Sequence, residues 1–582
     1  MALYVLKTAG SDPAADALAT LAGFTGIEVR CISDPEVHRG AGEAIHLAAT
    51  GRSLLSFVSR PESRAWLLRE LSVPGSSLFL YGGTADQALL SAVDSIVPDV
   101  VTGARCVDAD DVEYRIPADV SDGLDVFAGL SFGPVDRTTH AFELRGGASA
   151  STLVAVNGGS CCLKIRRGES SVFLNGCEAP LDIDSPASKT EDLLDRFLSF
   201  APFLAYLRTT FGRLCWHNPQ PAACVIIDDP LLKPRYGFLN FAKLEEAIDR
   251  SAFSTTIAFI PWNFRRSNPA VARRFTRGDR RLSLCIHGCD HTGAEFGSTN
   301  PEVLRARASR AIRSMEIHQQ LTGISHSRVM VFPQGVFSTA SLAALEQEGF
   351  AAAVNTTVHP VDAPGRISYR DLMDVAAVRF DGVPVFMRHY PGRPARFALD
   401  LFLGRPVLIV EHHSFFKNGY DTLEWYASFV NRIAPRIRWT DLDDVCASAY
   451  LTRKDSSDNT QIQAFAGVVR LVNDGDEPLR VSVANRWARN DIESVSWNGR
   501  PVRCDRGPGA MCQLELSARE RGELRYHRSS SHATVPVVHP TAADRVRVFV
   551  RRRLCEFRDN HVATSAALRP LAKIIRPVFS RI

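Results

Sequence analysis

The chain has 582 residues, more than one hydrophobic core can organise, so about three to five domains are expected. Apolar residues make up 45% and charged residues 23%, the ordinary composition of a soluble globular protein. The net charge of +4 is too small to indicate a nucleic-acid partner, and no run of about 18 uncharged apolar residues predicts a membrane-spanning helix. These numbers do not specify an oligomeric state.

The start of the chain and its cysteines favour a cytoplasmic protein. Residues 1–7 lack a basic region followed by a long apolar core, so they predict a strand and not a signal peptide. The 13 cysteines are odd in number, form no Cys-x-x-Cys pair, and in places (Cys224, Cys285) lie inside apolar runs. This predicts reduced thiols rather than a disulfide framework or a cysteine zinc finger. Cys161 and Cys162 are interpreted as buried filler in a strand.

Residues 1–110 alternate between strand and helix patterns, the rhythm of an open α/β domain. The predicted strands are 3–6, 27–32, 54–58 and 78–81, and the predicted helices are 12–21 and 61–71. Gly82-Gly83-Thr84 is interpreted as a tight strand-to-helix turn, with an anion site at the helix start as the alternative. Residues 111–195 change to short alternating runs, which predict antiparallel hairpins in a small β subdomain.

Residues 196–455 return to alternating strands and helices, and here the strands end in polar residues. The strand patterns cover 226–229, 256–263, 282–287, 329–333 and 407–413, and helical patterns between them include 301–321 and 338–348. Polar residues gathered at strand C-termini predict a β/α barrel, whose active site forms at that rim. An open doubly wound sheet would also bind ligands at its strand ends.

The last part of the chain divides into a β domain and a basic tail. Residues 456–530 predict a β-sandwich, with a hairpin at Asn498-Gly499. Residues 531–582 form a tail in which basic and apolar positions mix, as in 545–554 and 571–576; from 541 to 582 the ten Lys/Arg and three Asp/Glu sum to +7. Such an amphipathic tail can make peripheral contact with an anionic membrane face. A helix packed on the body with a solvated basic face is the alternative.

The centre of the predicted chemistry is the stretch Val225-Ile226-Ile227-Asp228-Asp229-Pro230. It reads as a buried strand that ends in two adjacent carboxylates. Two ionised acids side by side repel, and burial penalises both, so a bound cation or a retained proton is expected there. A plain turn after a strand is the alternative.

A second motif, His287-Gly288-Cys289-Asp290-His291, also follows an apolar strand. Its two histidines can bind one ion when the intervening backbone turns. With one carboxylate of the Asp pair they make a three-ligand open site, as expected of a catalytic divalent metal. Two structural or surface histidines are the alternative.

The order of these motifs resembles carbohydrate esterase family 4, the polysaccharide deacetylases, over residues 215–445. The resemblance rests on Asp-Asp, His-x-x-x-His, a later Pro-x-Gly and a late strand that ends in histidine. It implies a distorted β/α barrel that holds a divalent metal, most often Zn²⁺. It also implies that Asp228 is the catalytic base and that Asp229, His287 and His291 bind the metal. The catalytic acid falls on His412 or His413.

The chain also departs from the family pattern. Pro230 follows the Asp pair where the family usually has Gly, and Val331 stands where an Arg usually orients the base. Arg265, Arg266 or Arg388 is expected to substitute for that Arg. The family's Asp-Trp motif is not found.

The late histidine and several further residues complete the predicted site. Because neighbours in a strand face opposite sides, only one of His412 and His413 is expected to reach the site. His412 is slightly favoured, since the match Val410-Glu411-His412 keeps an apolar residue at its first position. Glu411 beside them is either buried near the metal or part of a surface salt bridge, and Asp290 either orients a ligand histidine or caps a helix. The predicted substrate-binding residues are Trp262, Asn263, Pro333 and Gly335. Trp262 can stack on a sugar ring, with a core residue as the alternative.

The sequence therefore predicts a metal-dependent hydrolase that removes acetyl groups from an N-acetylated or O-acetylated sugar or polysaccharide precursor. A metal-activated water needs an Asp base, and a poor amine leaving group needs a His acid. The expected location is the cytoplasm or the inner membrane face. Two alternatives remain: a non-catalytic glycan-binding or polysaccharide-assembly protein, and a glycoside hydrolase, which would need two carboxylates flanking the bond.

Overall fold

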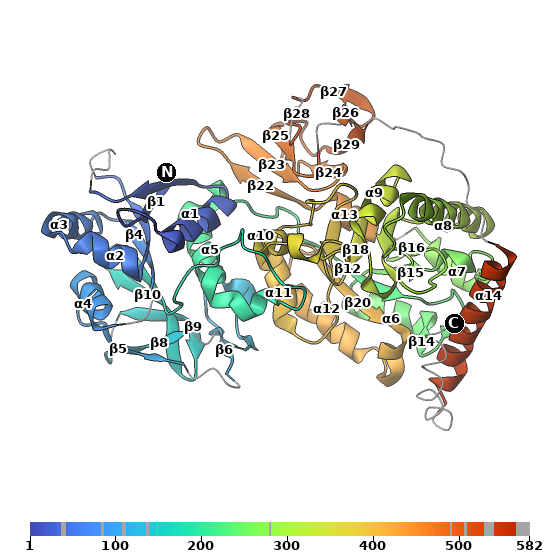
Figure 1. Cartoon of the computed structure of the whole chain (residues 1–582), viewed down its shortest axis with the longest axis horizontal. Helices are drawn as coiled ribbons and strands as arrows, with labels where there is room; N and C mark the ends of the chain where they lie inside the picture. Colours follow the sequence, from blue (N-terminus) through green and yellow to red (C-terminus); the bar gives the residue numbers. More distant parts are fainter. Residues whose placement is uncertain are drawn as a thin grey trace. The chain divides into compact units, whose positions relative to one another are not determined.

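The computed structural model describes residues 1–35, 42–82, 86–107, 112–134, 139–147, 149–278, 281–488, 492–505, 509–528 and 541–565. It is a mixed α/β structure with two compact units (Figure 1). Unit 1 comprises Met1–His217, Ser368–Met373 and Arg453–Asn459. Unit 2 comprises Asn218–Ile367, Asp374–Thr452 and Thr460–Ile582. No helix in the described ranges is long and apolar enough to cross a membrane.

Unit 1 is built on one mixed sheet of 11 strands with the main order β2-β1-β3-β4-β11-β10-β9-β6-β7, and β8 joins β10 to β5. Its strands are β1 (Ala2–Leu6), β2 (Glu28–Ile32), β3 (His46–Thr50), β4 (Ser77–Tyr81), β5 (Val101–Cys106), β6 (Tyr114–Arg115), β7 (Ser131–Phe132), β8 (His140–Leu144), β9 (Ala150–Val156), β10 (Gly159–Arg167) and β11 (Ser170–Asn175). The parallel half confirms the predicted βαβ rhythm of residues 1–110.

Two expectations for this unit were wrong. Because β4 pairs in parallel with β11, the strands of residues 111–195 continue the N-terminal sheet and do not form a separate subdomain. The predicted strand 54–58 is instead helix α2 (Gly51–Val58), since Thr50 and Ser53 form a capping box that starts a helix there. A short apolar run fits a buried strand and a helix face equally well. Gly83 and Thr84 of the predicted turn lie outside the described residues.

The other helices of the unit's main segment are α1 (Pro13–Phe24), α3 (Pro61–Glu70), α4 (Gln87–Ile96) and α5 (Phe197–Phe211). Helix α5 is almost entirely buried and belongs to unit 1, although the predicted barrel domain began at residue 196. Its backbone accepts hydrogen bonds from Tyr81 and Asn175 of the sheet. Cys161 and Cys162 are buried in β10, as predicted.

The core of unit 2 is the predicted barrel, a curled parallel sheet with the order β19-β18-β17-β16-β15-β12-β20. Its strands are β12 (Ala222–Asp228), β15 (Thr255–Phe259), β16 (Leu282–His287), β17 (Val329–Val331), β18 (Ala352–Asn355), β19 (Val385–Met387) and β20 (Val407–His412), and β21 (Arg438–Trp439) adds to β12. A parallel bridge from His389 to Ile409 nearly closes the sheet into a barrel. All parallel strand ends therefore meet at one rim.

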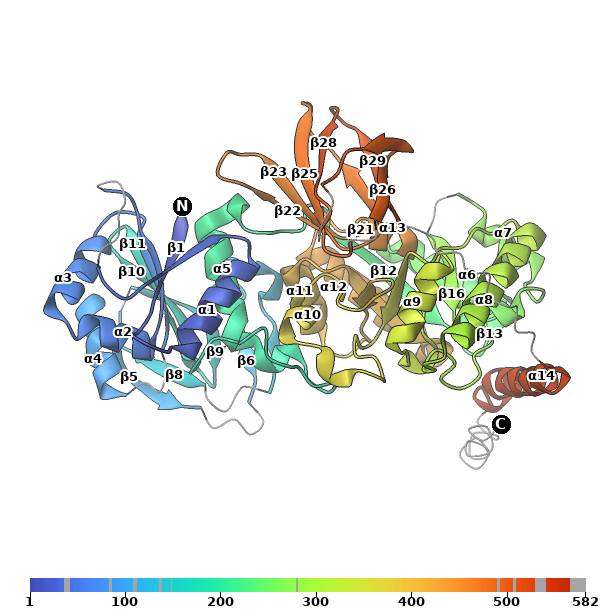
Figure 2. The same ribbon diagram turned by 45° about the horizontal axis from the view of Figure 1, so that its top comes forward.

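Helices surround these strands in Figures 1 and 2. They are α6 (Phe241–Ser251), α7 (Pro269–Phe275), α8 (Pro301–Thr322), α9 (Thr339–Gln347), α11 (Pro394–Leu403), α12 (Asp421–Ile433) and α13 (Leu442–Ala447). The short helix α10 (Tyr369–Met373) belongs to unit 1. The hairpin β13 (Arg235–Tyr236) and β14 (Leu239–Asn240) follows β12 at the rim. Asparagine side chains cap α6, α7 and α8, which is why each helix begins where it does.

The chain then forms two four-stranded sheets that share one apolar core. Their strands are β22 (Tyr450–Lys454), β23 (Thr460–Ala464), β24 (Val468–Val472), β25 (Leu479–Asn485), β26 (Ile492–Trp497), β27 (Arg500–Val502), β28 (Cys512–Leu516) and β29 (Arg521–Arg528). The predicted Asn498-Gly499 hairpin is confirmed, with both residues at positive φ between β26 and β27. A disulfide joins Cys504 to Cys512, so the expectation of reduced thiols throughout was wrong.

Within the tail, helix α14 (Ala542–Phe557) and the π-helical turn η8 (Arg558–Val562) are described. Residues 531–540 and 566–582 of the tail lie outside the described part. In Figures 1 and 2 α14 lies beside the hairpin β13–β14. Its C-terminal end packs on the body, which is the alternative that the sequence left open.

Candidate metal centre and active site

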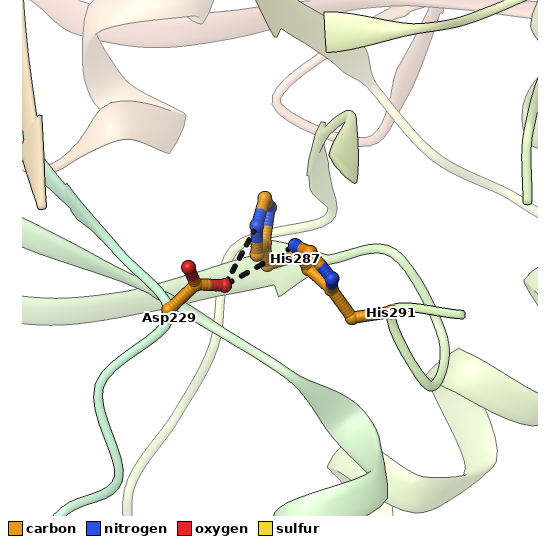
Figure 3. Close-up of side chains that lie close together, drawn as sticks. All are labelled: Asp229, His287 and His291. Carbon is orange, nitrogen blue, oxygen red and sulfur yellow. Dashed lines mark ion pairs between the residues drawn. The ribbon is translucent and has the colours of Figure 1, made fainter. Parts of the chain in front are cut away.

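One carboxylate and two imidazoles converge at the rim of the barrel (Figure 3). Asp229 directly follows β12, His287 is the last residue of β16, and His291 lies in the loop after it. The Oδ1 atom of Asp229 lies 3.3 Å from Nε2 of His287 and 3.3 Å from Nε2 of His291. Two tetrahedral ligand atoms at about 2.1 Å from one zinc ion are themselves about 3.4 Å apart. The spacing therefore fits three ligands of one divalent ion.

The surroundings of the cluster also fit a metal. The Nδ1–H group of His287 donates to the carbonyl oxygen of Val331 at 3.0 Å, which leaves Nε2 free to coordinate. Oδ1 of Asp229 is buried without a hydrogen-bond partner. Asp229 also has a φ of 80°, a left-handed conformation that is rare for aspartate and concentrates at functional sites. A cation between the three side chains would give this oxygen the partner that it lacks.

Charge in the cluster also favours a bound cation. Burial raises the pKa of Asp229, but His291 and His287 outweigh it and lower this pKa well below its ordinary value. Burial lowers the pKa of His291 to about 4, so this imidazole is neutral near pH 7. Burial also lowers the pKa of His287, but Asp228 and Asp229 outweigh it and raise this pKa. A bound metal ion and a proton would compete for the His287 imidazole.

The loop that carries His291 is held by a buried carboxylate. Glu295 accepts backbone N–H hydrogen bonds from Cys289 at 2.9 Å, Asp290 at 3.3 Å and His291 at 3.1 Å. Gly288 has a φ of +64°, and a Cβ there would lie 2.1 Å from Oε1 of Glu295. Only glycine lets the loop close this tightly over the carboxylate.

Asp290 takes a third role that the sequence did not anticipate. Its carboxylate accepts a hydrogen bond from Arg310 of α8 at 2.7 Å and bonds from Thr292, so it touches neither ligand histidine and caps no helix. Arg310 also donates to Sγ of Cys289 at 3.0 Å. Asp290 thus links the loop that carries His291, called the metal loop below (residues 288–295), to α8.

The second aspartate, Asp228, is bound by an arginine from a different strand. Arg388 follows β19, and its Nη1 and Nη2 donate to the two oxygens of Asp228 at 2.8 and 2.7 Å. Each residue is 2% exposed, and Val331 at the family's usual Arg position is a fully buried strand residue. Burial raises the pKa of Asp228, but Arg388 and His287 outweigh it and lower this pKa. Among the three arginines proposed as substitutes, Arg388 occupies this place.

The other two arginines lie elsewhere. Arg266 donates to Oδ1 of Asn263 at 3.1 Å and pairs with Glu556, while the Arg265 guanidinium lies over the Phe264 ring.

The two late histidines face different surroundings. Nε2 of His412 lies 3.9 Å from Oδ2 of Asp228, and the side chain is 37% exposed. It stacks on Tyr390, with ring centroids 6.0 Å apart. A substrate at the rim can reach this imidazole.

His413 turns instead toward the C-terminal segment. Its ring meets Tyr236 edge-on at 5.4 Å, and its Nε2 lies 3.6 Å from Asp559. Gly237 has a φ of +57°, and a Cβ there would lie 2.1 Å from Nδ1 of His413. Glycine is required at this close approach. Of the two histidines, the structure brings His412 to the Asp pair.

Glu411 precedes them at the end of β20. It is half-buried, accepts the His412 backbone N–H at 3.3 Å, and forms no ion pair with a described residue. Burial raises the pKa of this carboxyl to about 7. The alternative of a surface salt bridge was therefore wrong.

The predicted substrate-binding residues lie at the same rim in short 3-10 turns. Trp262 and Asn263 belong to Pro261–Asn263, and the backbone N–H of Trp262 donates to the Cys289 carbonyl at 3.0 Å. The Trp262 ring contacts Phe549 of α14 and the Arg266 guanidinium, and Nδ2 of Asn263 is buried without a partner.

Pro333 and Gly335 form the turn after β17. Pro333 packs against Gly288, and the Gly335 carbonyl accepts from Asn355 at 3.0 Å. Their contact with a substrate stays a prediction, as does that of Trp262 and Asn263.

Sequence reasoning missed several rim residues. Glu295 has no motif neighbour, and its only signal was its position four residues after His291. Tyr236 and Asp559 are 323 residues apart and meet only in the folded chain, where the Tyr236 hydroxyl donates to Asp559 at 2.8 Å. Glu556 likewise pairs with Lys233. No local pattern reveals contacts over such separations.

Similar solved structures match the central part of the chain. A family 4 carbohydrate esterase from Streptomyces lividans is 11% identical, with 38% of this chain and 91% of that chain covered at a TM-score of 0.24. A peptidoglycan deacetylase from Bacillus subtilis is 10% identical, with coverages of 39% and 91% and a TM-score of 0.24. A pseudoenzyme of the same esterase family from Bacillus anthracis is 9% identical, with coverages of 39% and 66% and a TM-score of 0.24.

The structures that match thus include polysaccharide deacetylases of carbohydrate esterase family 4, over about 39% of the chain. No protein-family model matches the chain, and no curated protein matches it. At these identities and TM-scores, the chemistry of the site has to be argued from its own residues.

Proposed function

We propose that the barrel is a metal-dependent hydrolase that removes acetyl groups from an N-acetylated or O-acetylated sugar or polysaccharide precursor. One observation supports this most directly. An open set of three ligands, an arginine-bound carboxylate and an accessible histidine lie together at one barrel rim. Hydrolysis of an acetyl amide requires these three functions.

Asp229, His287 and His291 would hold the metal, and one carboxylate with two imidazoles suits Zn²⁺. When bound, such an ion activates water at neutral pH and stabilises negative charge on a carbonyl oxygen. The chain orients the ligands by the Val331 carbonyl on His287 and the Glu295 carboxylate beneath the His291 loop. Coordinating side chains held in this way need little reorganisation on binding.

Asp228 would accept the proton of the attacking water. Arg388 occupies one lone pair on each of its oxygens, and each oxygen retains a second lone pair for that proton. The lowered pKa keeps Asp228 ionised near pH 7. Arg388 also fixes the direction of the carboxylate, since its two donors form a rigid planar fork.

His412 would donate a proton to the leaving nitrogen or oxygen. It stands 3.9 Å from Asp228 and is open to the rim. Histidine titrates near neutral pH and can therefore give up a proton to an amine leaving group. His413 would be a structural residue, since its side chain faces Tyr236 and Asp559.

The glycoside hydrolase alternative fits the rim less well. It needs one carboxylate as acid and another as base or nucleophile on opposite sides of a bond. Asp228 and Asp229 are neighbours, one bound by Arg388 and the other turned to the two imidazoles. The non-catalytic glycan-binding reading remains the second candidate, because an intact metal site can also bind a sugar.

Metal content and acetate release measured on the same variants test the proposal. We expect purified protein to bind about one Zn²⁺ and to release acetate from chitooligosaccharides, an N-acetylated sugar precursor or an O-acetylated glycan. Asp229→Asn should lose both properties, and His412→Gln should keep the metal and lose acetate release. The matched control is His413→Gln, which should retain the metal and activity. Full metal loading without acetate from any of these substrates would favour the glycan-binding protein, and metal-free protein would refute the site.

We also propose that α14 attaches the protein to an anionic membrane surface at the inner membrane face. Val546, Val550 and Phe557 lie on one side of the helix and are 63%, 40% and 53% exposed. Arg547 and Arg551 lie beside this stripe on the same helix. An apolar stripe next to cations complements acyl chains and anionic head groups.

Vesicle sedimentation tests this attachment. Binding to vesicles with anionic lipid should exceed binding to neutral vesicles and should fall in a Val550→Glu/Phe557→Glu variant. Trp425→Glu is the control, since Trp425 is an exposed aromatic residue on α12. Equal binding by all three proteins would refute the attachment.

A further inference from the structure

One face of the C-terminal segment meets the loops around the metal cluster. Residues 549, 556 and 559 recur at spacings of seven and three, so they lie on one side of the helix. Each one contacts the rim: Phe549 packs on Trp262, Glu556 pairs with Lys233 and Arg266, and Asp559 binds Tyr236 and His413. A residue at position 552 belongs to the same face.

That residue is Arg552, which is 5% exposed. Its Nε is buried without a hydrogen-bond partner, as is Nε of Arg388 and of Arg405. Those two guanidiniums, however, pair through Nη2 with Asp228 at 2.7 Å and with Asp400 at 2.8 Å. Among the described residues no carboxylate forms an ion pair with Arg552, and the neighbouring Glu556 and Asp559 pair with Lys233 and Arg558. A buried charge without a partner is costly, so a ligand that supplies one is expected.

The place of Arg552 follows from its neighbours. Phe549, one turn before it, packs on Trp262, whose backbone N–H is bonded to Cys289 of the metal loop. Asp559, two turns after it, binds the Tyr236 hydroxyl. Arg552 therefore lies between two contacts with the rim, on the face of the helix that meets it.

We infer that Arg552 binds an oxyanion of the substrate, so that the preferred substrate is an acetylated sugar carrying a carboxylate or a phosphate. This inference rests on the proposed deacetylase function. A guanidinium matches both oxyanions with two parallel N–H donors, which a neutral sugar cannot use as well. With Asp228 neutralised by Arg388 and a divalent ion on Asp229, the rim would be positive and would attract an anionic ligand.

The test compares Arg552→Gln with Arg545→Gln in the full-length, metal-loaded protein. Arg545 is an exposed residue of the same helix, so the control removes the same charge without touching the rim. Acetate release is measured with N-acetylglucosamine 1-phosphate, with N-acetylglucosaminuronic acid and with neutral diacetylchitobiose. Calorimetric titration with inorganic phosphate supplies a readout that is independent of activity.

We expect Arg552→Gln to raise KM for at least one anionic substrate about 10- to 100-fold, as for the loss of a charged hydrogen bond. Its KM for diacetylchitobiose should stay within about twofold, since no charge–charge contact is lost there. Phosphate binding should weaken in parallel, while Arg545→Gln behaves as the wild type. The two anionic sugars distinguish a phosphate-bearing from a carboxylate-bearing substrate. Zinc content should be unchanged and the melting temperature should not fall, because Arg552 has no partner to lose.

Other outcomes separate the two proposals. If the wild type uses neutral and anionic sugars equally well and Arg552→Gln changes nothing, the anion site is wrong and the deacetylase stands. If no substrate releases acetate but Arg552→Gln alone loses phosphate binding, the anion site stands and the deacetylase is wrong. A lowered melting temperature of Arg552→Gln with unchanged phosphate binding would show a structural role and overturn the inference.

Discussion

Asp228 and Asp229 are adjacent in the chain, yet their side chains have different partners. Asp228 ends β12 and meets the Arg388 guanidinium, while Asp229 has a φ of 80° and turns its Oδ1 to two imidazoles. The repulsion expected between two neighbouring acids is thus relieved, since each has its own cationic or metal-binding partner. The left-handed backbone at Asp229 thus accompanies the division between the proposed base and the proposed ligand.

Removal of Arg388 should be costly for stability. Arg388→Met leaves Asp228 buried and unpaired, so we expect the free energy of unfolding to fall by about 3–5 kcal/mol. Adding Asp228→Asn should recover part of this loss, because it removes the unpaired negative charge of the buried Asp228 carboxylate. The measurement is urea unfolding at pH 7. The control, Arg328→Met, breaks an exposed pair with Glu316 and should cost less than about 1 kcal/mol. Equal losses in both variants would contradict a buried, structurally important pair.

Two glycines of the metal loop should respond differently to a methyl group. Gly288 and Gly293 have similar φ values of +64° and +62°, but a Cβ meets Glu295 only at Gly288 and nothing within 4 Å at Gly293. Gly293→Ala should therefore cost only about 1–2 kcal/mol of backbone strain and keep the metal. Gly288→Ala should in addition displace the loop and lower zinc retention after dialysis. Identical zinc retention in the two variants would argue against a loop held by the hydrogen bonds from residues 289–291 to Glu295.

At the scale of elements, the C-terminal end of α14 is held by charge to loops at the barrel rim. Glu556 pairs with Lys233 and Arg266, and Asp559 with His413 and Arg558. Burial raises the pKa of both carboxyls, but their cationic partners outweigh it and lower each pKa. A lowered folded-state pKa means that the group stabilises the folded state above its unfolded pKa. This contribution disappears as the pH falls through the folded value.

We therefore expect α14 to be released by acid. Its contacts should be fully present above about pH 5 and should weaken below about pH 4, near the unfolded pKa values of Asp and Glu. Hydrogen exchange of α14 amides, corrected for intrinsic rates and compared with α8, measures the release. Glu556→Gln/Asp559→Asn should show the released pattern already at pH 7. Protection of α14 that does not change between pH 3 and pH 7 would contradict this charge-based anchor.

At the scale of the whole molecule, the metal cluster lies entirely in one of the two compact units. All three ligands belong to Asn218–Ile367 of unit 2. A ligand that binds only the folded state stabilises the part that it binds, by about 2.7 kcal/mol at 100 times its dissociation constant. Zinc should therefore raise the unfolding temperature of unit 2 more than that of unit 1.

Scanning calorimetry with and without zinc checks this prediction. Two transitions are expected, and zinc should shift one of them. Asp229→Asn should abolish the shift without moving the other transition. A single transition that moves as a whole would show that the two units unfold cooperatively.

Local patterns predicted the elements whose residues depend mostly on their neighbours in the chain. The barrel strands ending at Asp228 and His287 and the hairpin at Asn498-Gly499 follow from apolar runs, polar strand ends and turn chemistry. The prediction of a strand at 54–58 was wrong because its short apolar run fits a strand and a helix equally well. The capping box of Thr50 and Ser53 favours the helix.

Contacts between distant segments could not be predicted in this way. Arg388 was one of three candidate arginines, and only the barrel's curvature brings it to Asp228, 160 residues earlier. The parallel pairing of β4 with β11 merged two predicted domains into one sheet.

The sequence by itself determined which residue types stand at the strand ends, an Asp pair and two histidines, and hence a candidate metal site. Periodicity and spacing act within a few residues, so they were sufficient for these two motifs. The choice of Asp229 rather than Asp228 as the ligand came from the family resemblance. Only the tertiary structure decided that Arg388 binds Asp228 and that His412 rather than His413 approaches it. It also decided that Arg552 is buried on the helix face that contacts the rim. These choices depend on burial and on contacts between segments far apart in the chain, which no local pattern encodes.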